Sequence, residues 1–300
     1  MGLTLATFNV ENLLEPKSEA DRSILAGKIE SISRKVRACD ADVVGLQEIG
    51  PPDLLRAVVE RTDGGYRESV IGTADRRGIR CALLSRLPLV LSEVHTADAL
   101  SFPVFNEGDP RPFGDRIPLR RGVVHARVQA PGLGPLDVLV VHFKSSRRVP
   151  LRDAAGNEVP ATTARDRAEG ALRSLVWRAA EALHVRGLAD DVMAGGGARL
   201  AVVGDLNDVP DSLPVRIVRG DGPAELLDCT AGIAPTARFS AFHDGPLQID
   251  HVLASAALHA RLLDARFLNE DLAPRAPIAL DGREAPSVDS DHAPLVVRFG

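Results

Sequence analysis

Short apolar runs that meet a polar side chain at one end recur along the whole chain, and this pattern constrains the fold more than any other feature. Runs of about four to eight apolar residues, such as residues 3–8 and 200–203, are typical of buried strands. A polar side chain at the end of such a strand lies at the edge of a sheet, where clefts form. The polar residues in these positions are Asn9, Glu48, His142, Asp205, Asn207, Asp250, His251, Asp291 and His292.

Two longer segments have the periodicity of amphipathic helices. Within residues 18–38, the side chains of Leu25, Ile29 and Val36 fall on one helical stripe, and residues 163–185 repeat the pattern. Helices that alternate with clusters of strands, some of them antiparallel neighbours, predict an α/β fold of two stacked sheets with helices outside. The predicted strands are residues 3–8, 42–48, 66–71, 80–85, 89–95, 121–129, 136–142, 200–205, 249–254 and 294–299.

Three stretches rich in proline, glycine and charge are predicted to be irregular. They are residues 97–120, 145–162 and 270–290, and glycines at positions 195–197 predict a turn. Long loops inside a compact domain are usually functional or mobile. Two of these stretches adjoin the polar run ends.

Composition excludes several classes of protein. With 300 residues, 45% of them hydrophobic and 26% charged, the chain has enough apolar material for a large core. Three widely spaced cysteines suggest neither a disulfide framework nor a zinc knuckle. The N-terminal segment does not resemble a signal peptide, and no stretch of about 18 uninterrupted apolar residues occurs. We therefore expect a cytoplasmic protein without a membrane span, and nothing in the sequence indicates a protein partner.

The polar residues at the run ends share a definite chemistry. Singly, each has an ordinary structural interpretation: Asp205 suits a turn, and His142, after three apolar residues, suits a core histidine. Together they supply the carboxylate and amide oxygens that Mg²⁺ or Mn²⁺ accepts, and histidines that donate protons. Such a set fits metal-assisted attack of water on a phosphoester. Neither the HExxH spacing of zinc hydrolases nor the GxSxG elbow of serine hydrolases occurs.

Six motifs occur in order along nearly the whole chain: residues 7–12 (TFNVEN), 42–48 (DVVGLQE), 140–145 (VVHFKS), 203–208 (VGDLND), 248–253 (QIDHVL) and 290–294 (SDHAP). In this order they resemble the endonuclease/exonuclease/phosphatase family, which has the DNase I-like fold. The resemblance implies a four-layer α/β/β/α sandwich of two stacked mixed β-sheets flanked by helices. It also implies a single domain over residues 1–300, because a site that draws on both Asn9 and His292 needs both sheets in one unit.

The resemblance implies roles for individual residues. Asn9 and Glu48 look like ligands of the divalent metal, with Glu48 as the principal one. Asp291 looks like a further contact to the metal or to its water. Asp205 looks like the group that orients or deprotonates the attacking water, and Asn207 like the group that helps to hold that water or the phosphate.

Two histidines complete the implied site. His292 would contact the scissile phosphate, while Asp250 fixes its tautomer and favours its charged form. His142 resembles the second histidine on the phosphate side, which stabilises charge on the phosphoryl oxygens or the leaving group. Many relatives carry an acidic or amide residue where this chain has Arg80. Either Asp75 replaces that residue as the partner of His142, or Arg80 itself binds phosphate.

The distribution of charge bears on the substrate. The net charge is −5, yet nine basic residues between Arg111 and Arg152 stand against two acidic ones. This segment includes His142, so it predicts a positive rim beside the metal site, with Lys144 and Arg147 as contacts to substrate phosphates. The alternative interpretation is an ordinary solvated surface.

The leading hypothesis is a Mg²⁺- or Mn²⁺-dependent phosphodiesterase, a nuclease of low sequence specificity that hydrolyses DNA or RNA. No groove-reading helix or zinc finger is apparent. A phosphatase or phosphodiesterase for a small-molecule or lipid-headgroup phosphoester is the alternative. An aromatic content of 4% favours it, since few side chains can stack on bases. A non-catalytic binding module that keeps the fold is a third hypothesis.

Overall fold

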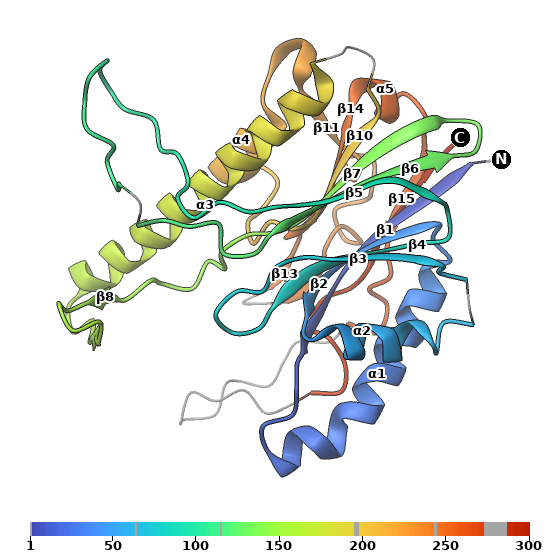
Figure 1. Cartoon of the computed structure of the whole chain (residues 1–300), viewed down its shortest axis with the longest axis horizontal. Helices are drawn as coiled ribbons and strands as arrows, with labels where there is room; N and C mark the ends of the chain where they lie inside the picture. Colours follow the sequence, from blue (N-terminus) through green and yellow to red (C-terminus); the bar gives the residue numbers. More distant parts are fainter. Residues whose placement is uncertain (1, 64, 115, 195–197, 243–244, 273–286) are drawn as a thin grey trace.

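Two mixed β-sheets of six strands each lie face to face, with helices on both outer faces (Figure 1). The structure is a computed structural model, and it describes residues 2–63, 65–114, 116–194, 198–242, 245–272 and 287–300. The layers confirm the predicted α/β fold, a four-layer α/β/β/α sandwich.

The first sheet contains the N-terminal and C-terminal strands of the chain side by side. β1 runs parallel to β2, the next strand in the chain, and antiparallel to β16, the last one. In spatial order the strands are β15 (Leu262–Phe267), β16 (Leu295–Phe299), β1 (Leu3–Leu13), β2 (Val43–Ile49), β4 (Arg80–Ser85) and β3 (Glu68–Ile71).

The second sheet is built from the middle of the chain. β7 runs parallel to β10, and β14 runs antiparallel to β10 on its other side. In spatial order the strands are β11 (Leu226–Asp228), β14 (Asp250–Ser255), β10 (Leu200–Asp205), β7 (Gly134–His142), β6 (Val123–Ala130) and β5 (Leu89–His95).

Two long helices cover the outer faces of the sheets. Their N-termini are fixed by capping boxes, in which Ser18 and Thr163 each accept a hydrogen bond from the third helical residue. The predicted helices over 18–38 and 163–185 are confirmed, although the second continues further. The helices are α1 (Glu19–Cys39) and α2 (Pro52–Val59) on the first sheet, α3 (Ala164–Met193) and α4 (Leu213–Arg219) on the second, and the short α5 (Ala256–His259) and η1 (Gly222–Ala224).

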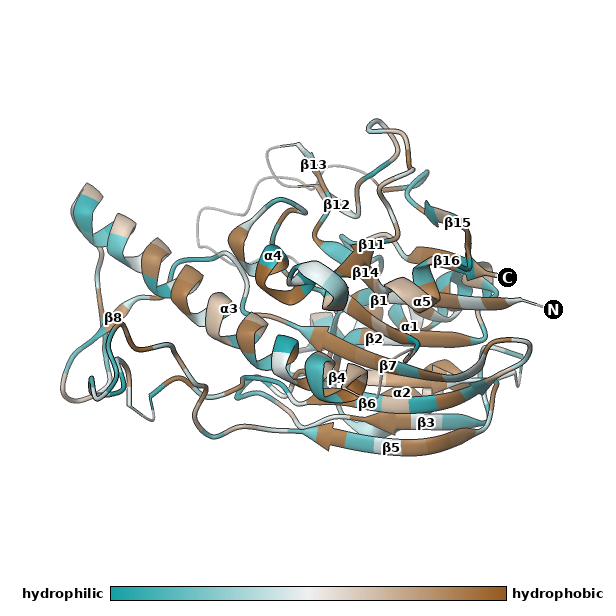
Figure 2. Ribbon diagram, turned by 90° about the horizontal axis from the view of Figure 1, so that it is seen from above, coloured by the Kyte–Doolittle hydropathy of each residue, from teal (hydrophilic) through white to brown (hydrophobic). Residues whose placement is uncertain are grey.

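Apolar side chains fill three layers. One layer lies between the two sheets, one between the first sheet and the helices α1 and α2, and one between the second sheet and the helices α3 and α4. Figure 2 shows hydrophobic residues concentrated along the strands of the stacked sheets. Among the described helices, none has the length and apolar character that crossing a membrane requires.

Some elements differ from the sequence prediction. The predicted loop 145–162 contains a small hairpin, β8 (Leu151–Arg152) and β9 (Glu158–Val159), and a second small hairpin pairs β12 (Ala241–Phe242) with β13 (Pro246–Leu247). The prediction also missed β15, because this edge strand is half exposed and has no continuous apolar run. The predicted turn at 195–197 and positions 273–286 of the predicted loop 270–290 lie outside the described residues.

The close approach of the two sheets gives a first testable prediction. A Cβ atom at Gly45 on β2 would lie 2.9 Å from Val203 and 3.1 Å from Val140, both on the second sheet. Gly45→Ala is therefore expected to lower the free energy of unfolding by about 1–3 kcal/mol through overpacking. Gly187→Ala on α3 is the control, since no atom lies within 4 Å of its Cβ position. The Gly187→Ala substitution should raise the free energy of unfolding by about 0.5–1 kcal/mol. Urea denaturation measures both, and equal stability of the two variants would contradict the prediction.

Candidate functional site

The polar ends of strands from both sheets meet at one edge of the sandwich. Because β1 and β2 are parallel, Asn9 and Glu48 lie at the same edge of the first sheet. Because β7 and β10 are parallel, His142 lies directly beside Asp205 in the second sheet. Antiparallel β14 begins at Asp250, which is paired with Asp205 on the other side. The sheet topology therefore brings together groups that lie far apart in the sequence.

A cavity of about 150 Å³ opens at this edge. Eight of the eleven residues that the sequence analysis singled out for the site line it, and Asp250, Arg80 and Lys144 do not. The described lining residues are Asn9, Glu11, Asn12, Glu48, Arg77, Arg120, Arg121, His142, Ser145, Ser146, Arg147, Asp205, Asn207, Ile249, Asp291 and His292.

The buried carboxylate of Asp205 is held by two asparagines. Its Oδ2 accepts hydrogen bonds from Asn9 Nδ2 at 2.9 Å and from Asn207 Nδ2 at 3.2 Å. Its Oδ1 accepts a third from the backbone N–H of Asn207 at 2.8 Å. Burial, together with the nearby charge of Asp250, raises the pKa of Asp205. The result is a fixed carboxylate that binds a proton more readily than an ordinary aspartate.

His292 and Asp250 form a buried pair. His292 Nδ1 lies 2.7 Å from Asp250 Oδ2, while His292 Nε2 lies 4.0 Å from Asp205 Oδ2 and 3.8 Å from Asp291 Oδ1. Burial opposes protonation of His292, but the charge and hydrogen bond of Asp250 and the charges of Asp205 and Asp291 outweigh it. They hold the pKa of His292 well above its ordinary value. Asp250 thus acts on the cavity through His292, although it does not line the cavity.

His142 has the opposite character. Its Nε2 lies 3.5 Å from Asp205 Oδ2 and 3.9 Å from Glu48 Oε1. Burial lowers the pKa of His142 well below its ordinary value, and the charges of Arg121 and His292 lower it further. The cavity therefore pairs a neutral imidazole with a protonated one.

Asp75 does not contact His142, and Arg80 does not line the cavity. Asp75 Oδ2 instead lies 3.3 Å from Arg121 Nε, and Arg80 donates to the carbonyl oxygens of Gly50 and Gly78. Among the described residues, His142 Nδ1 has no hydrogen-bond partner. Arg121 donates to the carbonyl oxygen of His142, so Asp75 acts on the histidine only through the arginine and the backbone. The positions of these side chains therefore support neither a contact of Asp75 with His142 nor phosphate binding by Arg80.

The backbone is strained around the cavity. Six non-glycine residues of the described chain have positive φ angles, and four of them line the cavity. Glu48 has a φ of 65°, and its Oε2 accepts a hydrogen bond from the backbone N–H of Asn12 at 2.8 Å. Strain of this kind persists only where the surrounding structure enforces it, and it concentrates at functional sites. The four residues are Glu11, Asn12, Glu48 and Asn207.

Two sets of side chains in this region could hold a metal ion. The predicted ligands Asn9, Glu48 and Asp291 all line the cavity. Asp205, Asp250 and His292 form a second, compact set, whose ligand atoms lie within 4.8 Å of one another. The family resemblance instead implies proton chemistry for this second set.

Arginines supply the positive charge of the cavity. Arg147 lines it as predicted, and sequence reasoning missed Arg77, Arg120 and Arg121 as site residues. A signal was present for two of them, since Arg120 directly precedes the predicted strand 121–129 and Arg121 begins it, at the same edge as the other site residues. Of the predicted rim, Arg127 instead pairs with Asp137, on the other face of the second sheet, and Arg152 pairs with Glu158 in the hairpin.

Lys144 supports a loop and does not line the cavity. Its Nζ donates hydrogen bonds to the carbonyl oxygens of Ser145 and Arg147 and lies 3.1 Å from Ser145 Oγ. The predicted contact of Lys144 with substrate phosphate therefore has no support in its position. The same loop is fixed from α3, where Glu181 Oε2 accepts a hydrogen bond from the backbone N–H of Lys144 at 2.6 Å.

Glu181 gives a prediction of pH dependence. Burial raises the pKa of this carboxyl from 4.5 to about 6. A raised pKa means that the folded state binds the proton more tightly. The stability this contributes is present below pH 4.5 and is lost as pH rises through about 6. A shift of this size corresponds to about 2 kcal/mol.

Glu181→Gln removes this titration, so the stability of the wild type relative to the variant should fall between about pH 5 and pH 7. Urea denaturation of both proteins across this range measures the difference. A constant difference would contradict the prediction.

Comparisons with known proteins agree with this architecture. A model of the endonuclease/exonuclease/phosphatase family matches residues 6–292. No curated protein matches the sequence at a significant level. Three solved structures share the fold at low sequence identity. They are truncated TDP2 from Caenorhabditis elegans (16% identity, 99% of this chain and 97% of that chain, TM-score 0.57), the mannosyl-6-phosphatase Bt3783 from Bacteroides thetaiotaomicron (18%, 98% and 98%, 0.63) and an AP endonuclease from Archaeoglobus fulgidus (17%, 99% and 99%, 0.58).

Proposed function

Since the chain belongs to the endonuclease/exonuclease/phosphatase family and is therefore a phosphoester hydrolase, we propose that it is a divalent-metal-dependent phosphodiesterase acting on DNA or RNA. One observation carries the proposal. A fixed carboxylate, Asp205, faces a protonated imidazole, His292, across 4.0 Å at the bottom of an arginine-lined cavity. This arrangement provides a proton acceptor and a proton donor next to each other, where both can reach one phosphate group and its attacking water.

The chain's own residues supply most of the chemistry. Asp205 accepts a proton from the attacking water, and Asn9 and Asn207 keep its carboxylate aimed at that water. The oxygen of the water bonds to phosphorus, and the bond from phosphorus to the leaving oxygen breaks with its electron pair on that oxygen. The leaving oxygen then takes a proton from solvent. His292 donates its Nε2–H to a phosphoryl oxygen and stabilises the charge that develops there, while Asp250 keeps the imidazole charged and oriented. His142 Nε2 lies beside Asp205 and faces the same phosphate group.

The oxygen donors of the cavity fit a hard divalent cation. We assign Glu48 as the principal ligand of Mg²⁺ or Mn²⁺, with Asn9 and Asp291 beside it, because carboxylate and amide oxygens are the ligands these ions accept. When bound, the ion would polarise a phosphoryl oxygen. Asp250 and His292 are assigned to proton chemistry, because the 2.7 Å hydrogen bond between them already occupies one ligand atom of each.

The lining of the cavity supports a polyanionic substrate. Arg77, Arg120 and Arg147 suit successive phosphates of a polyanion. Arg121 is instead bound to Asp75 and to backbone carbonyl oxygens. No Phe, Tyr or Trp is among the described residues that line the cavity, so bases have no platform for stacking. The enzyme should therefore recognise the backbone and show little sequence specificity. The named activities of the structural neighbours include both an AP endonuclease and a mannosyl-6-phosphatase.

The lack of stacking residues also favours the second candidate, a phosphatase or phosphodiesterase for a small-molecule or lipid-headgroup phosphoester. A cavity of about 150 Å³ can hold a single phosphoryl group and its neighbouring atoms. The two candidates differ in whether the arginines contact one phosphate or several.

A substrate panel tests the proposal. Plasmid DNA, single-stranded DNA, RNA, a bis-aryl phosphodiester and a sugar phosphate are incubated with the protein in Mg²⁺ or Mn²⁺, with and without EDTA. We expect hydrolysis of nucleic acid that EDTA abolishes and Mn²⁺ restores. Hydrolysis of the sugar phosphate alone would support the second candidate, and activity unaffected by EDTA would contradict metal dependence. Asp205→Asn protein, purified in the same way, controls for contaminating nucleases.

Two further predictions stay part of the proposal. We propose one domain over residues 1–300, since the cavity draws on strands of both sheets. We also propose a cytoplasmic location, which fits three buried cysteines that form no disulfide.

A further inference from the structure

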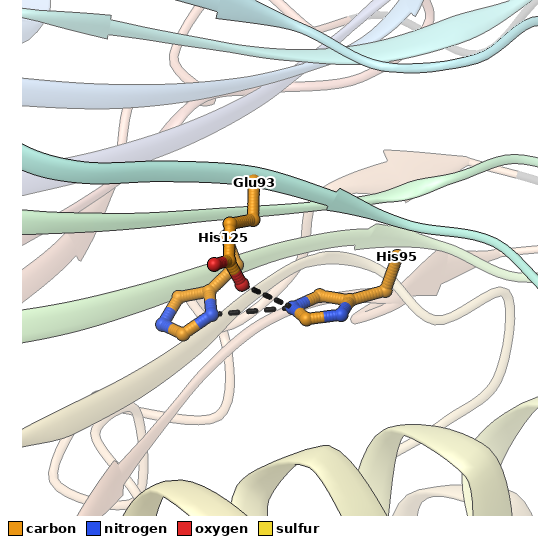
Figure 3. A group of neighbouring side chains, drawn as sticks. All are labelled: Glu93, His95 and His125. Carbon is orange, nitrogen blue, oxygen red and sulfur yellow. Dashed lines mark hydrogen bonds and ion pairs between the residues drawn. The ribbon is translucent and has the colours of Figure 1, made fainter.

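The second sheet carries another cluster of side chains that can bind a metal, and this cluster is separate from the cavity. Glu93 and His95 come from β5, and His125 comes from β6 (Figure 3). Each offers one ligand atom, and these atoms lie within 4.8 Å of one another. We propose that this cluster binds a divalent transition-metal ion of the zinc type.

Strand alternation places the cluster on the outer face of the sheet. Val124 and Ala126 on β6 point into the layer between the sheets, so His125 points to the opposite face. Val123, two residues before His125, packs in the layer beneath α3. The cluster therefore faces the α3 side of the sheet and is separate from the site of His142.

The distances suit a metal ion. His95 Nε2 and His125 Nδ1 lie 3.2 Å apart, and Glu93 Oε2 lies 3.8 Å from His95 Nε2 (Figure 3). Two nitrogens that each bind zinc at about 2.0–2.1 Å in tetrahedral geometry are about 3.3 Å apart. The two imidazoles therefore already have the spacing of two ligands to one ion.

A carboxylate behind His125 fixes the orientation of its ring. His125 Nε2 lies 2.7 Å from Asp137 Oδ1, and Arg127 Nε donates to both oxygens of Asp137 at 3.0 Å. When Nε2 carries the hydrogen that Asp137 accepts, the lone pair of Nδ1 faces His95 and Glu93. Histidine ligands of metals almost always have such a partner on the other ring nitrogen.

The same geometry has an explanation without a metal, and the two explanations exclude each other. In the first, His95 Nε2–H donates to His125 Nδ1 between rings whose centroids lie 5.4 Å apart. In the second, His95 carries its hydrogen on Nδ1, and a metal ion binds to Nε2 of His95 and to Nδ1 of His125. Burial, together with the charge of His125, lowers the pKa of His95, which keeps this ring in the neutral form that binds metals.

A route for the ion is present. The side chain of Glu93 is 53% exposed and that of His95 is 27% exposed, so an ion can reach the cluster from solvent. Imidazoles with one carboxylate favour Zn²⁺, Co²⁺, Ni²⁺ or Cu²⁺ over Mg²⁺. A bound ion would tie the edge strand β5 to β6.

Zinc titration tests the site. Metal-free wild-type protein and the double variant Glu93→Ala/His95→Ala are titrated with Zn²⁺ by isothermal calorimetry, with Mg²⁺ in large excess. We expect the wild type to bind one more equivalent of Zn²⁺ than the variant. Zn²⁺ should also raise the Tm of the wild type more than that of the variant, and EDTA should reverse the effect. Co²⁺ should give a visible absorption band that only the wild type shows.

Control variants separate binding from folding. Both replaced side chains are partly exposed, and the milder pair Glu93→Gln/His95→Asn removes the ligands with a smaller loss of volume than the alanine pair. His259→Ala changes a histidine on α5 outside the cluster and should bind Zn²⁺ as the wild type does. Equal Zn²⁺ binding by the wild type and both folded double variants would overturn the assignment. So would a wild type whose Co²⁺ spectrum matches that of the variants.

Discussion

Asp205→Asn is expected to lower kcat for phosphodiester hydrolysis by about 10³-fold while leaving KM within a few-fold of the wild type. The variant keeps the volume of the side chain but removes the group that accepts the proton of water. KM should change little, because the arginines that line the cavity remain in place. Steady-state kinetics on a bis-aryl phosphodiester measures both constants.

Folding must be checked in the same variant. Asp205 accepts three hydrogen bonds from Asn9 and Asn207, and an asparagine can accept them through only one of its two terminal atoms. We therefore expect a loss of stability of about 1–3 kcal/mol, which urea denaturation measures. Asp211→Asn, at an exposed position nearby, is the control and should keep full activity. A folded Asp205→Asn protein with near wild-type kcat would show that the base lies elsewhere.

The pairing of Asp250 with His292 gives the second large effect. His292→Gln is expected to lower kcat/KM by about 10²-fold to 10³-fold, because it removes the charged donor to the phosphate. Asp250→Asn should lower it by about 10²-fold. An asparagine can still accept the hydrogen bond of His292 Nδ1–H at the position of Oδ2, but it no longer stabilises the charge of the buried ring.

The double variant separates a positioning role from an independent one. Because Asp250 acts through His292, Asp250→Asn/His292→Gln should lose about as much kcat/KM as His292→Gln alone. If the loss of kcat/KM in the double variant instead equals the product of the two single losses, Asp250 contributes by a separate route. Asp264→Asn, on the exposed edge strand β15, is the matched control and should leave kcat/KM unchanged.

Much of the fold could be predicted because the pattern is local. Strands β4 and β10 begin and end where the apolar runs predict, since a buried strand needs apolar side chains along its whole length. The edge strand β15 gave a weaker signal. Nearly all positions of β15 are exposed or half-exposed, and the strand has no such run. The two short hairpins are fixed by pairing between a few residues.

The candidate site was predictable to a different degree for each residue. Strand ends at Asn9, Glu48 and Asp205 could be recognised, because a polar group after a buried run must lie at a sheet edge. The hydrogen-bond and ion-pair partners of charged side chains could not be recognised from the sequence. Arg80 and Lys144 carry the right charge in the right motif, yet their nitrogens donate to carbonyl oxygens of nearby loops.

By itself, the sequence determined most strands of the two large sheets, the two long helices, the order of the six motifs and the identity of half of the described residues that line the cavity. Tertiary structure alone decided which arginines line the cavity, that His142 and His292 hold their protons so differently, and that Glu93, His95 and His125 converge. The physical reason is that burial and through-space distance set the charge state and partner of a side chain. Both depend on residues that the chain brings together only when it folds.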